Sequence, residues 1–409
     1  MKTVVIEIKE RTVFQENLIY FFRDEKFVFF FNSNDNSPNI LAVSNSGYIK
    51  DGDWKVGFYS YDYKNKIEKL VSENEDSIEF PDEFFFTPQL LFEIYQNKVC
   101  VSFDNQYFTE NNTIEIIAKL DSKRSKIKSK KISVFPKISK DLYIRHVNQL
   151  KNHIQKGDIY EINYCQEFYA NSVEINPFDC YFKLNEKSPT PFSCFVKFTN
   201  KYLLCASPER FMRKTGNKII SQPIKGTIKR GATLLEDEQL KNQLQNDPKE
   251  RSENIMIVDL VRNDLSKIAK RNSVKVDELC AIYTFPQVHQ MISTISAELK
   301  KEVDFKQIIH ALFPMGSMTG APKIRAMELI EQYETSKRGL YSGTVGFIKP
   351  NGDFDFNVVI RSILYNASSK NLSYFVGGAI TSLSEPEKEY EECLLKAKAI
   401  QDVLENNDI

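Results

Sequence analysis

The sequence predicts an α+β fold, and two observations lead to this prediction. Residues 1–120 contain short aromatic or alternating segments separated by turns rich in Asn, Asp, Gly and Ser, as in antiparallel strands: TVVIEI, KFVFFF, NILAVS, KVGFYSY and KVCVSF. The rest of the chain mixes strand-like and helical segments that do not alternate strictly. Strict alternation would indicate a doubly wound parallel sheet, so the observed order favours α+β.

Composition bounds the class of protein. The 409 residues suffice for one large domain or two ordinary ones, and Lys+Arg and Asp+Glu both number 55, which argues against a nucleic-acid partner. Seven cysteines without C-x-x-C spacing indicate reduced thiols. The N-terminus lacks the apolar run of a signal peptide, and the longest apolar runs, such as Phe27–Phe31, are too short to cross a bilayer. We therefore expect a cytoplasmic protein without a membrane partner.

The organisation along the chain suggests two regions. The basic segment SKRSKIKSKK at 122–131 is typical of a solvated linker, and it carries no interleaved aromatic residues that would favour nucleic-acid binding. We divide the chain into a β-rich region, 1–135, that packs on a larger region, 136–409. In the larger region the apolar spacing predicts helices over 139–155, 236–246, 250–270, 320–335 and 385–405. It also predicts strands at CFVKF, YLLCAS, GTVGFI, FNVVIRSILY and LSYFVGGAI.

Two predicted helices each carry a Glu-x-x-Glu pair along an apolar stripe. Glu250 and Glu253 lie on the first of these helices, and Glu389 and Glu392 lie on the C-terminal one. Ser384 and Glu387 are predicted to form a capping box at the start of the C-terminal helix. Buried carboxylates need cations, and four of them favour a hard divalent ion, Mg²⁺. Ordinary surface glutamates on amphipathic helices remain the alternative for either pair alone.

Arg361 lies inside FNVVIRSILY, a segment that is apolar at alternating positions on both sides and therefore predicts a strand buried on both faces. An arginine in that setting needs an anion, either a substrate carboxylate or a structural partner such as Asp355 or Asp259. The Gly-rich segments 316–323 and 374–381 could bring backbone N–H groups close to anionic oxygens, although each could equally be an ordinary turn.

Lys225 in SQPIKGT is flanked by Pro223 and Gly226, which constrain the backbone, and by apolar Ile224. A lysine held in such a turn can have a lowered pKa and act as a nucleophile. Upstream, Glu209 in SPERF follows a predicted strand and is a candidate acid or base. The alternative for each residue taken alone is an ordinary surface side chain.

Eight motifs stand in one order: SPERF, PIKGT, ERSENIMIVDLVRNDL, GSMTGAPK, RGLYSGTVGFI, VVIRS, GGAIT and EKEYEECLLKA. Together they resemble the chorismate-binding family, which includes anthranilate, aminodeoxychorismate, isochorismate and salicylate synthases. The resemblance covers about residues 140–407, and GDWKVGFYSYD at 51–62 is similar to an N-terminal segment of the family. It implies two large, mostly antiparallel β-sheets packed as a sandwich and flanked by helices.

The resemblance also implies roles for individual residues. Glu253 and Glu392 correspond to direct Mg²⁺ ligands, and Glu250 and Glu389 to residues that hold the waters of the metal. His289 corresponds to a catalytic histidine of the ammonia-using branch. The expected contacts to chorismate are Arg361, Tyr341, Lys396, Thr319 and the backbone of Gly378 and Ala379.

Lys225 favours one branch of the family. PIKGT resembles aminodeoxychorismate synthase component I, whereas anthranilate synthases usually carry PIAGT. The implied activity converts chorismate and ammonia to 4-amino-4-deoxychorismate, for 4-aminobenzoate and folate synthesis, through a covalent Lys225 adduct with Glu209 as acid. Anthranilate synthase component I is the main alternative. Glu161 stands where the isochorismate branch normally carries lysine, which makes an isochorismate or salicylate synthase a weaker alternative, as is a non-catalytic chorismate-binding subunit.

The source of ammonia is a further expectation. The sequence contains no G-x-C-x-G-x-Q nucleophile turn of a glutamine amidotransferase. Ammonia would then come from solution or from a separate glutamine amidotransferase subunit. No segment similar to the tryptophan-binding LLES motif of anthranilate synthases stands in the N-terminal region, which speaks against regulation by tryptophan.

Overall fold

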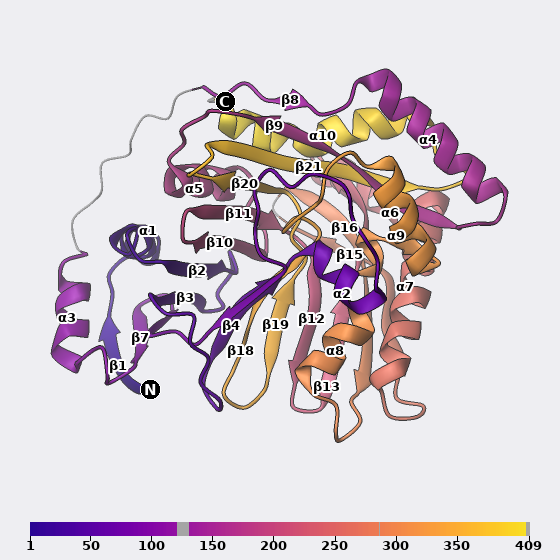
Figure 1. Ribbon diagram of the computed structural model, residues 1–409. Coiled ribbons are helices and arrows are strands. Elements are labelled where there is room, and N and C mark those ends of the chain that lie inside the picture. The colour runs from indigo at the N-terminus through magenta and orange to yellow at the C-terminus, as the bar shows by residue number, and fades with distance from the viewer. Residues whose placement is uncertain (121–130, 286, 406–409) are drawn as a thin grey trace.

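The computed structural model describes residues 1–120, 131–285 and 287–405. The segment predicted to be a linker lies outside these residues, apart from Lys131. Two antiparallel sheets face each other: in Figure 1 one rises from β1 and β7 at the lower left to β9 at the top, and the other descends through the centre of the view. Side chains from both sheets form one apolar core between them, which includes Phe29, Val196, Phe58 and Met212. The predicted α+β sandwich is confirmed.

The first sheet has twelve strands among the described residues, and all its pairs are antiparallel. In spatial order they are β1 (Lys2–Glu7), β7 (Lys98–Phe103), β6 (Leu90–Ile94), β3 (Asn39–Ser44), β2 (Phe27–Asn32), β10 (Phe192–Phe198), β11 (Lys201–Ser207), β20 (Ser362–Asn366), β21 (Asn371–Ile380), β9 (Glu161–Ala170) and β17 (Gly320–Ala321), with β8 (Phe135–Pro136) beside β9.

The second sheet has nine strands in the described part of the chain, also antiparallel. Their order is β14 (Ile224–Lys229), β16 (Val288–Glu298), β13 (Lys218–Gln222), β12 (Arg210–Thr215), β19 (Phe354–Asn357), β18 (Thr344–Ile348), β4 (Lys55–Tyr59) and β5 (Glu83–Phe86), and β15 (Lys275–Thr284) pairs with β16.

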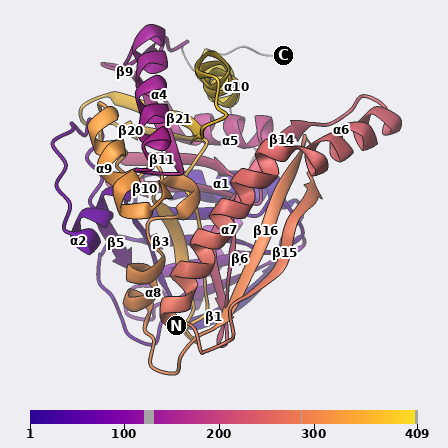
Figure 2. The ribbon, with the colours of Figure 1, turned by 90° about the vertical axis from the view of Figure 1, so that its right-hand side faces the viewer.

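Helices cover the outer faces of both sheets. The helix α10 (Pro386–Leu404) lies against β21 and beside α4 (Lys140–Gln155) on the first sheet, and α7 (Pro248–Ile268) packs on β16 of the second. Figure 2 shows α6 (Leu234–Asn246) extending away from the body of the molecule before α7 returns to it. The other helices are α1 (Arg11–Phe21), α2 (Lys64–Glu68), α3 (Glu110–Ala118), α5 (Pro177–Lys187), α8 (Phe305–Leu312), α9 (Lys323–Tyr333) and the 3₁₀ turns Tyr61–Tyr63 and Gly316–Met318.

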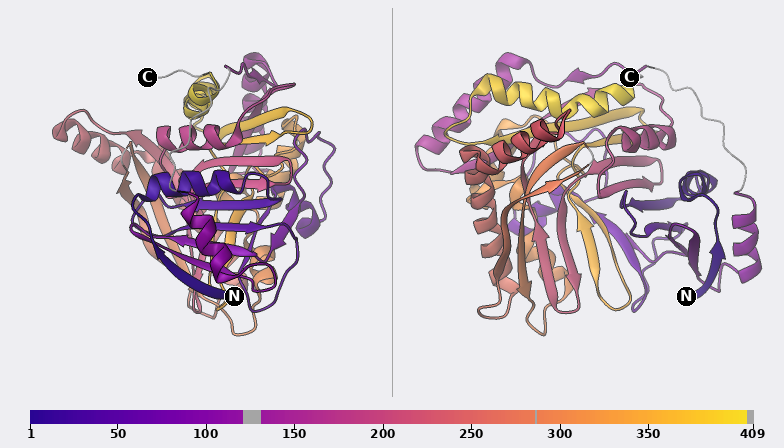
Figure 3. Two further views of the ribbon diagram at one scale, coloured as in Figure 1. Left: turned by 90° about the vertical axis from the view of Figure 1, so that its left-hand side faces the viewer. Right: turned by 180° about the vertical axis from the view of Figure 1, so that it is seen from behind.

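The N-terminal 120 residues contribute to both sheets. Strands β1, β2, β3, β6 and β7 extend the first sheet, whereas β4 and β5 extend the second. The helices α1 and α3, which the strand-rich pattern did not predict, lie on the outside of this region (Figure 3). In α1 the buried Phe14 and Leu18 are four residues apart, so the helical spacing is present but short and interrupted by buried polar residues.

The segment FNVVIRSILY does not form one strand, contrary to the prediction. Strand β19 ends at Asn357 in the second sheet and β20 begins at Ser362 in the first. The chain therefore crosses from one sheet to the other through four residues. Val358 and Val359 are fully buried in that passage, which explains the unbroken apolar pattern, and Arg361 takes a left-handed φ of 50° at its end.

Two further observations concern the whole chain as described. All seven cysteines are free thiols and six of them are buried. Among the described residues, no helix combines the length and apolarity needed to cross a membrane.

Candidate functional site

The four predicted metal ligands lie at the N-terminal ends of α7 and α10, which approach each other beside β14 and β21 (Figure 2). Glu250 and Glu389 lie in the first turns, where the positive end of the helix dipole favours carboxylates. Glu253 and Glu389 are buried, whereas Glu250 and Glu392 are partly exposed. Each Glu-x-x-Glu pair thus supplies one buried and one accessible carboxylate.

Lysine side chains connect these carboxylates. The Lys249 Nζ lies 3.0 Å from Glu389 Oε1 and 3.9 Å from Glu253 Oε1, so it joins the two helices. The Lys396 Nζ lies 2.7 Å from Glu392 Oε1 and donates to the carbonyl of Gly377 at 2.9 Å. The predicted pairs therefore face one another across a set of basic groups.

Burial and mutual repulsion weaken the acidity of two of the glutamates. Burial raises the pKa of Glu253 to about 7; the charges of Glu161 and Glu250 add to the rise and the ammonium of Lys225 opposes it. Burial and the neighbouring Glu392 also raise the pKa of Glu250. For Glu392, burial acts in the same direction, but the ammonium of Lys396 prevails and the pKa is lowered. A cation added to the lysine side chains already present would stabilise the ionised carboxylates of Glu250 and Glu253.

The donor set fits Mg²⁺. It consists of carboxylate oxygens, which this hard ion prefers, and the buried Glu253 Oε1 and Glu161 Oε2 have no hydrogen-bond partner within the described part of the chain. In the arrangement seen here, no three acidic, His or Cys side chains of the described residues gather as closely as a metal shell requires. The ammonium of Lys249 lies within 4 Å of both Glu253 and Glu389.

Lys225 lies in the strand β14 rather than in a turn, and it is buried. Its Nζ donates to Glu161 Oε1 at 2.7 Å. Burial by itself would lower the pKa of Lys225, but the charges of Glu161, Glu253 and Glu209 outweigh it and raise the pKa above its ordinary value. The predicted lowering of the Lys225 pKa is therefore wrong, because the sequence did not show that the charges of three carboxylates act on the amine.

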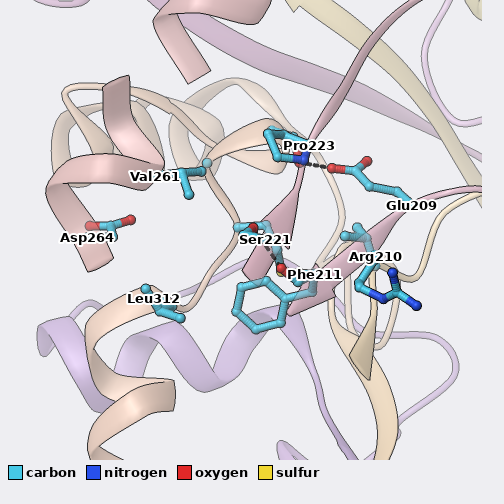
Figure 4. A pocket seen from close by; sticks show the side chains of 12 residues that line it. Glu209, Arg210, Phe211, Ser221, Pro223, Val261, Asp264 and Leu312 are labelled. Carbon is cyan, nitrogen blue, oxygen red and sulfur yellow. Dashed lines mark hydrogen bonds between the residues drawn. The ribbon is translucent and has the colours of Figure 1, made fainter. Parts of the chain in front are cut away.

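Glu209 lies between β11 and β12 and is buried (4% exposed). Its Oε1 accepts a hydrogen bond from Ser317 Oγ at 2.7 Å. Burial raises its pKa to about 7, although Ser317, Lys225 and Arg361 oppose that rise. The residue lines a cavity of about 20 Å³, enough for one water, together with Ser221, Val261, Asp264 and Leu312 (Figure 4). A carboxyl that is half protonated near neutral pH suits a general acid.

Arg361 is available for an external anion. The structural partners considered from sequence are engaged elsewhere: Asp355 accepts from Arg210 at 2.9 and 3.1 Å, and Asp259 accepts from Arg262. Among the described residues, the guanidinium of Arg361 makes no hydrogen bond or ion pair, and burial lowers its pKa. The charge of the Glu209 carboxylate acts against burial, in the direction that raises the pKa of Arg361.

Gly378 keeps the space between α10 and β21 open. A Cβ on Gly378 would lie 3.4 Å from Glu389 Oε2, 3.6 Å from Lys396 Nζ and 3.8 Å from Glu392 Oε1. Any side chain at this position would enter the space between the proposed metal ligands and the backbone of β21. Ala379 is the next residue of the same strand and is buried.

Two further predicted substrate contacts lie in tightly packed surroundings. The ring of Tyr341 stacks on Phe375 with centroids 5.2 Å apart. Thr319 is fully buried; its hydroxyl donates to the carbonyls of Met315 and Gly316, and its own carbonyl accepts from Asn163 N. These contacts fix the backbone of the Gly-rich turn.

His289 lies in β16 and faces α6. Its Nε2 lies 3.0 Å from Asp237 Oδ1 and its Nδ1 lies 2.9 Å from Thr284 Oγ1. The ring is buried and joined by these contacts to α6 and β15, and to none of the glutamates or lysines described above. A catalytic role for His289 stays a prediction.

Sequence reasoning missed two members of this site. Glu161 was considered only as the position where a lysine is lacking, yet it is the partner of Lys225. Lys249 received no role, although it precedes Glu250 directly and bridges the two helices. The signal was present in both cases, because a charged residue next to an apolar stripe needs a partner, but the partners come from segments far apart in the chain.

Similar proteins share this arrangement of elements. The sequence matches the family of chorismate binding enzymes over residues 23–402. It is 33% identical over 362 residues to aminodeoxychorismate synthase component 1 of Bacillus subtilis (strain 168), covering 86% of this chain and 76% of that protein. It is 43% identical over 270 residues to the probable chloroplastic aminodeoxychorismate synthase of Oryza sativa subsp. japonica, covering 65% of this chain.

The chain is also 40% identical over 293 residues to the chloroplastic aminodeoxychorismate synthase of Arabidopsis thaliana, covering 71% of this chain. The matched part spans only about a third of these two plant proteins, 30% of the Oryza protein and 31% of the Arabidopsis protein. Among solved structures, anthranilate synthase component I from Streptococcus pneumoniae TIGR4 superimposes with a TM-score of 0.77 at 24% identity, covering 98% of this chain and 92% of that one, which shows the shared fold. With the family matched over most of its sequence and its fold shared, the chain belongs to the chorismate-binding enzymes.

Proposed function

We propose that this chain is aminodeoxychorismate synthase component I, which converts chorismate and ammonia to 4-amino-4-deoxychorismate. The observation that carries the proposal is the buried Lys225–Glu161 pair, 2.7 Å apart, beside the glutamates proposed to hold Mg²⁺. The pair supports the proposal because Lys225 would supply the nucleophilic amine and Glu161 the acceptor for its proton. Similarity to aminodeoxychorismate synthases in bacteria and plants supports this choice.

The proposed reaction begins with binding. The guanidinium of Arg361 holds one substrate carboxylate, because it is unpaired among the described residues and matches a carboxylate in shape. Glu253 and Glu392 would hold Mg²⁺ directly, and Glu250 and Glu389 its waters. The ion would anchor the ring carboxylate and polarise the ring.

The chemistry then uses three side chains. Lys225 passes a proton to Glu161, with which it shares a hydrogen bond, and its neutral amine attacks ring carbon 2 while both ring double bonds shift and the 4-hydroxyl departs. Glu209 donates the proton that lets the hydroxyl leave as water, and its pKa of about 7 suits that task. Ammonia then attacks carbon 4, both double bonds return to their first positions and Lys225 is released, and Glu209 accepts the proton lost by the new amine.

The proposed reaction also needs a source of ammonia. The name component 1 of the bacterial relatives implies a second component, and we propose that a separate glutamine amidotransferase subunit delivers ammonia to this chain. The proposed setting is cytoplasmic, in line with seven free cysteines.

One assay tests the function. Purified chain is incubated with chorismate, Mg²⁺ and ammonium at raised pH, and the product is identified by mass. The expected product is 4-amino-4-deoxychorismate, with the enolpyruvyl group retained; glutamine in place of ammonium should give none. Pyruvate and anthranilate would instead identify anthranilate synthase component I, and isochorismate would identify the water-using branch.

A further inference from the structure

Lys249 occupies a special position in the site. It is the second residue of α7, and its ammonium lies 3.0 Å from Glu389 on α10 and 3.9 Å from Glu253 on its own helix. These two carboxylates are the most buried of the proposed metal ligands, with side chains 3% and 7% exposed. One cation therefore bridges the two helices at two buried glutamates.

Carboxylates outnumber ammonium groups among the proposed metal ligands and the charged side chains that contact them. Five carboxylates (Glu161, Glu250, Glu253, Glu389 and Glu392) face three ammonium groups (Lys225, Lys249 and Lys396), which leaves a formal charge of −2. Lys225 is held by Glu161, and Lys396 by Glu392 and the carbonyl of Gly377. Lys249 is the lysine of this set that joins α7 to α10.

We propose that Lys249 is the resident counter-cation of the metal-free site and that it gives up its two carboxylates when Mg²⁺ binds. This inference rests on the proposed Mg²⁺ site. Mg²⁺ requires oxygens at about 2.0–2.1 Å. An ion bound by Glu253 and, through water, by Glu389 needs the same oxygens that now face Lys249, and the two cations repel each other at that distance.

The side chain has room to leave. The Lys249 side chain is 34% exposed, and its flexible four-carbon stem can carry the ammonium into solvent without moving the helix. Lys249 thus keeps the acidic ends of α7 and α10 together before the metal arrives, and it competes with the metal afterwards. It is a positioning residue: it holds the site together in the absence of the metal, and it weakens metal binding because it competes for the same carboxylates.

The test compares Lys249→Met with Lys388→Met. Methionine keeps the length of lysine without its charge, and Lys388 is an exposed lysine near the same end of α10 that pairs with Glu385. Calorimetric titration with Mg²⁺ alone should show roughly tenfold tighter binding by Lys249→Met than by wild type, and a much smaller change for the control. In chelator, the melting temperature of Lys249→Met should fall by roughly 2 °C or more, and saturating Mg²⁺ should restore it.

Equal or weaker Mg²⁺ binding by Lys249→Met would overturn the inference, because Lys249 would then support the metal shell. An unchanged melting temperature in chelator would overturn it as well. The underlying metal site is tested separately with Glu253→Gln. Loss of Mg²⁺ binding in Glu253→Gln without tighter binding in Lys249→Met would refute the role of Lys249 alone, whereas unaltered binding in Glu253→Gln would refute the metal assignment itself.

Discussion

At the scale of single residues, the site depends on pairing between opposite charges in a buried setting. The carboxylate of Glu161 lies 2.7 Å from the amine of Lys225 and helps to raise its pKa, so the lysine proposed as the nucleophile is held in its protonated form. A bound cation near Glu253 would withdraw part of the negative charge that favours the ammonium. Substrate and metal would thus activate the lysine when they bind.

Lys225→Ala should bind chorismate almost normally, through Arg361 and Mg²⁺, and lose turnover by about 100-fold or more. Wild-type enzyme supplied with chorismate and Mg²⁺ but no ammonia should accumulate a covalent adduct, which intact mass and peptide mapping after an acid quench would locate at residues 222–230. Lys229→Ala, an exposed lysine of the same strand, serves as the control. Full product formation by Lys225→Ala would show that the lysine only forms an ion pair.

Glu209→Gln should change how stability depends on pH. Burial raises the pKa of Glu209 to about 7 in the folded chain, against about 4.3 in an unfolded one. The folded state therefore binds this proton more tightly than the unfolded state does. The contribution of the protonated Glu209 to the free energy of unfolding is complete below pH 4.3 and is lost as pH rises to 7. The loss amounts to about 4 kcal/mol at most.

Denaturant unfolding of the metal-free protein at a series of pH values measures this effect. The Glu209→Gln variant should not show the fall in the free energy of unfolding that is due to Glu209. Its stability relative to wild type should therefore improve between pH 4.3 and 7, while its turnover falls. The exposed Glu302→Gln should follow wild type. A decline of the same size in Glu209→Gln would assign it to other groups, such as Glu253.

At the scale of elements, the sequence predicted most of what the site needs. The five long helices appear within about three residues of their expected ends, because apolar spacing over many residues is a strong signal. The capping box at Ser384 and Glu387 is wrong: Glu385 occupies the cap position, and Ser384 Oγ bonds to Thr381 N and to Ala379 O. Ser384 therefore secures the end of β21 rather than the start of α10.

Asp247 caps α7 by accepting hydrogen bonds from the backbone N–H groups of Lys249 and Glu250. Asp247→Ala should reduce the free energy of unfolding by about 1 kcal/mol. Because fraying of this turn displaces Glu250, it should also weaken Mg²⁺ binding, measured by calorimetry. Thr233→Ala removes the cap of α6 in the same way and should leave Mg²⁺ affinity unchanged. Equal effects of both variants on Mg²⁺ would show that the cap does not organise the site.

At the scale of the whole molecule, the order of strands was beyond sequence reasoning. Pairs such as β2 with β10 join segments more than 150 residues apart, and no local pattern specifies which of many apolar strands will pair. The same limit concealed Glu161 and Lys249, whose partners lie on other elements. The family resemblance supplied the sandwich and the ligand set, whereas composition and periodicity supplied only the fold class.

Residues 136–409 produced alone should fold poorly. Without residues 1–135, β10 would lose its partner β2 and β18 would lose its partner β4. Both sheets would therefore gain a new unpaired edge. Sedimentation and binding of a hydrophobic dye should show aggregation or exposed apolar surface, under conditions where the full chain is monodisperse. A well-folded, chorismate-binding fragment would show instead that residues 1–135 form a dispensable domain.

The passage between β19 and β20 has a consequence for how the chain can vary in length. Four residues connect the two sheets directly at this point, and the last of them is Arg361. An inserted or deleted residue here would alter the separation of the sheets and move the guanidinium of Arg361 relative to Glu209. Surface loops such as the hairpin between β18 and β19 can gain or lose residues freely, but the span from 358 to 361 has to keep its length for the molecule to remain a chorismate-binding enzyme.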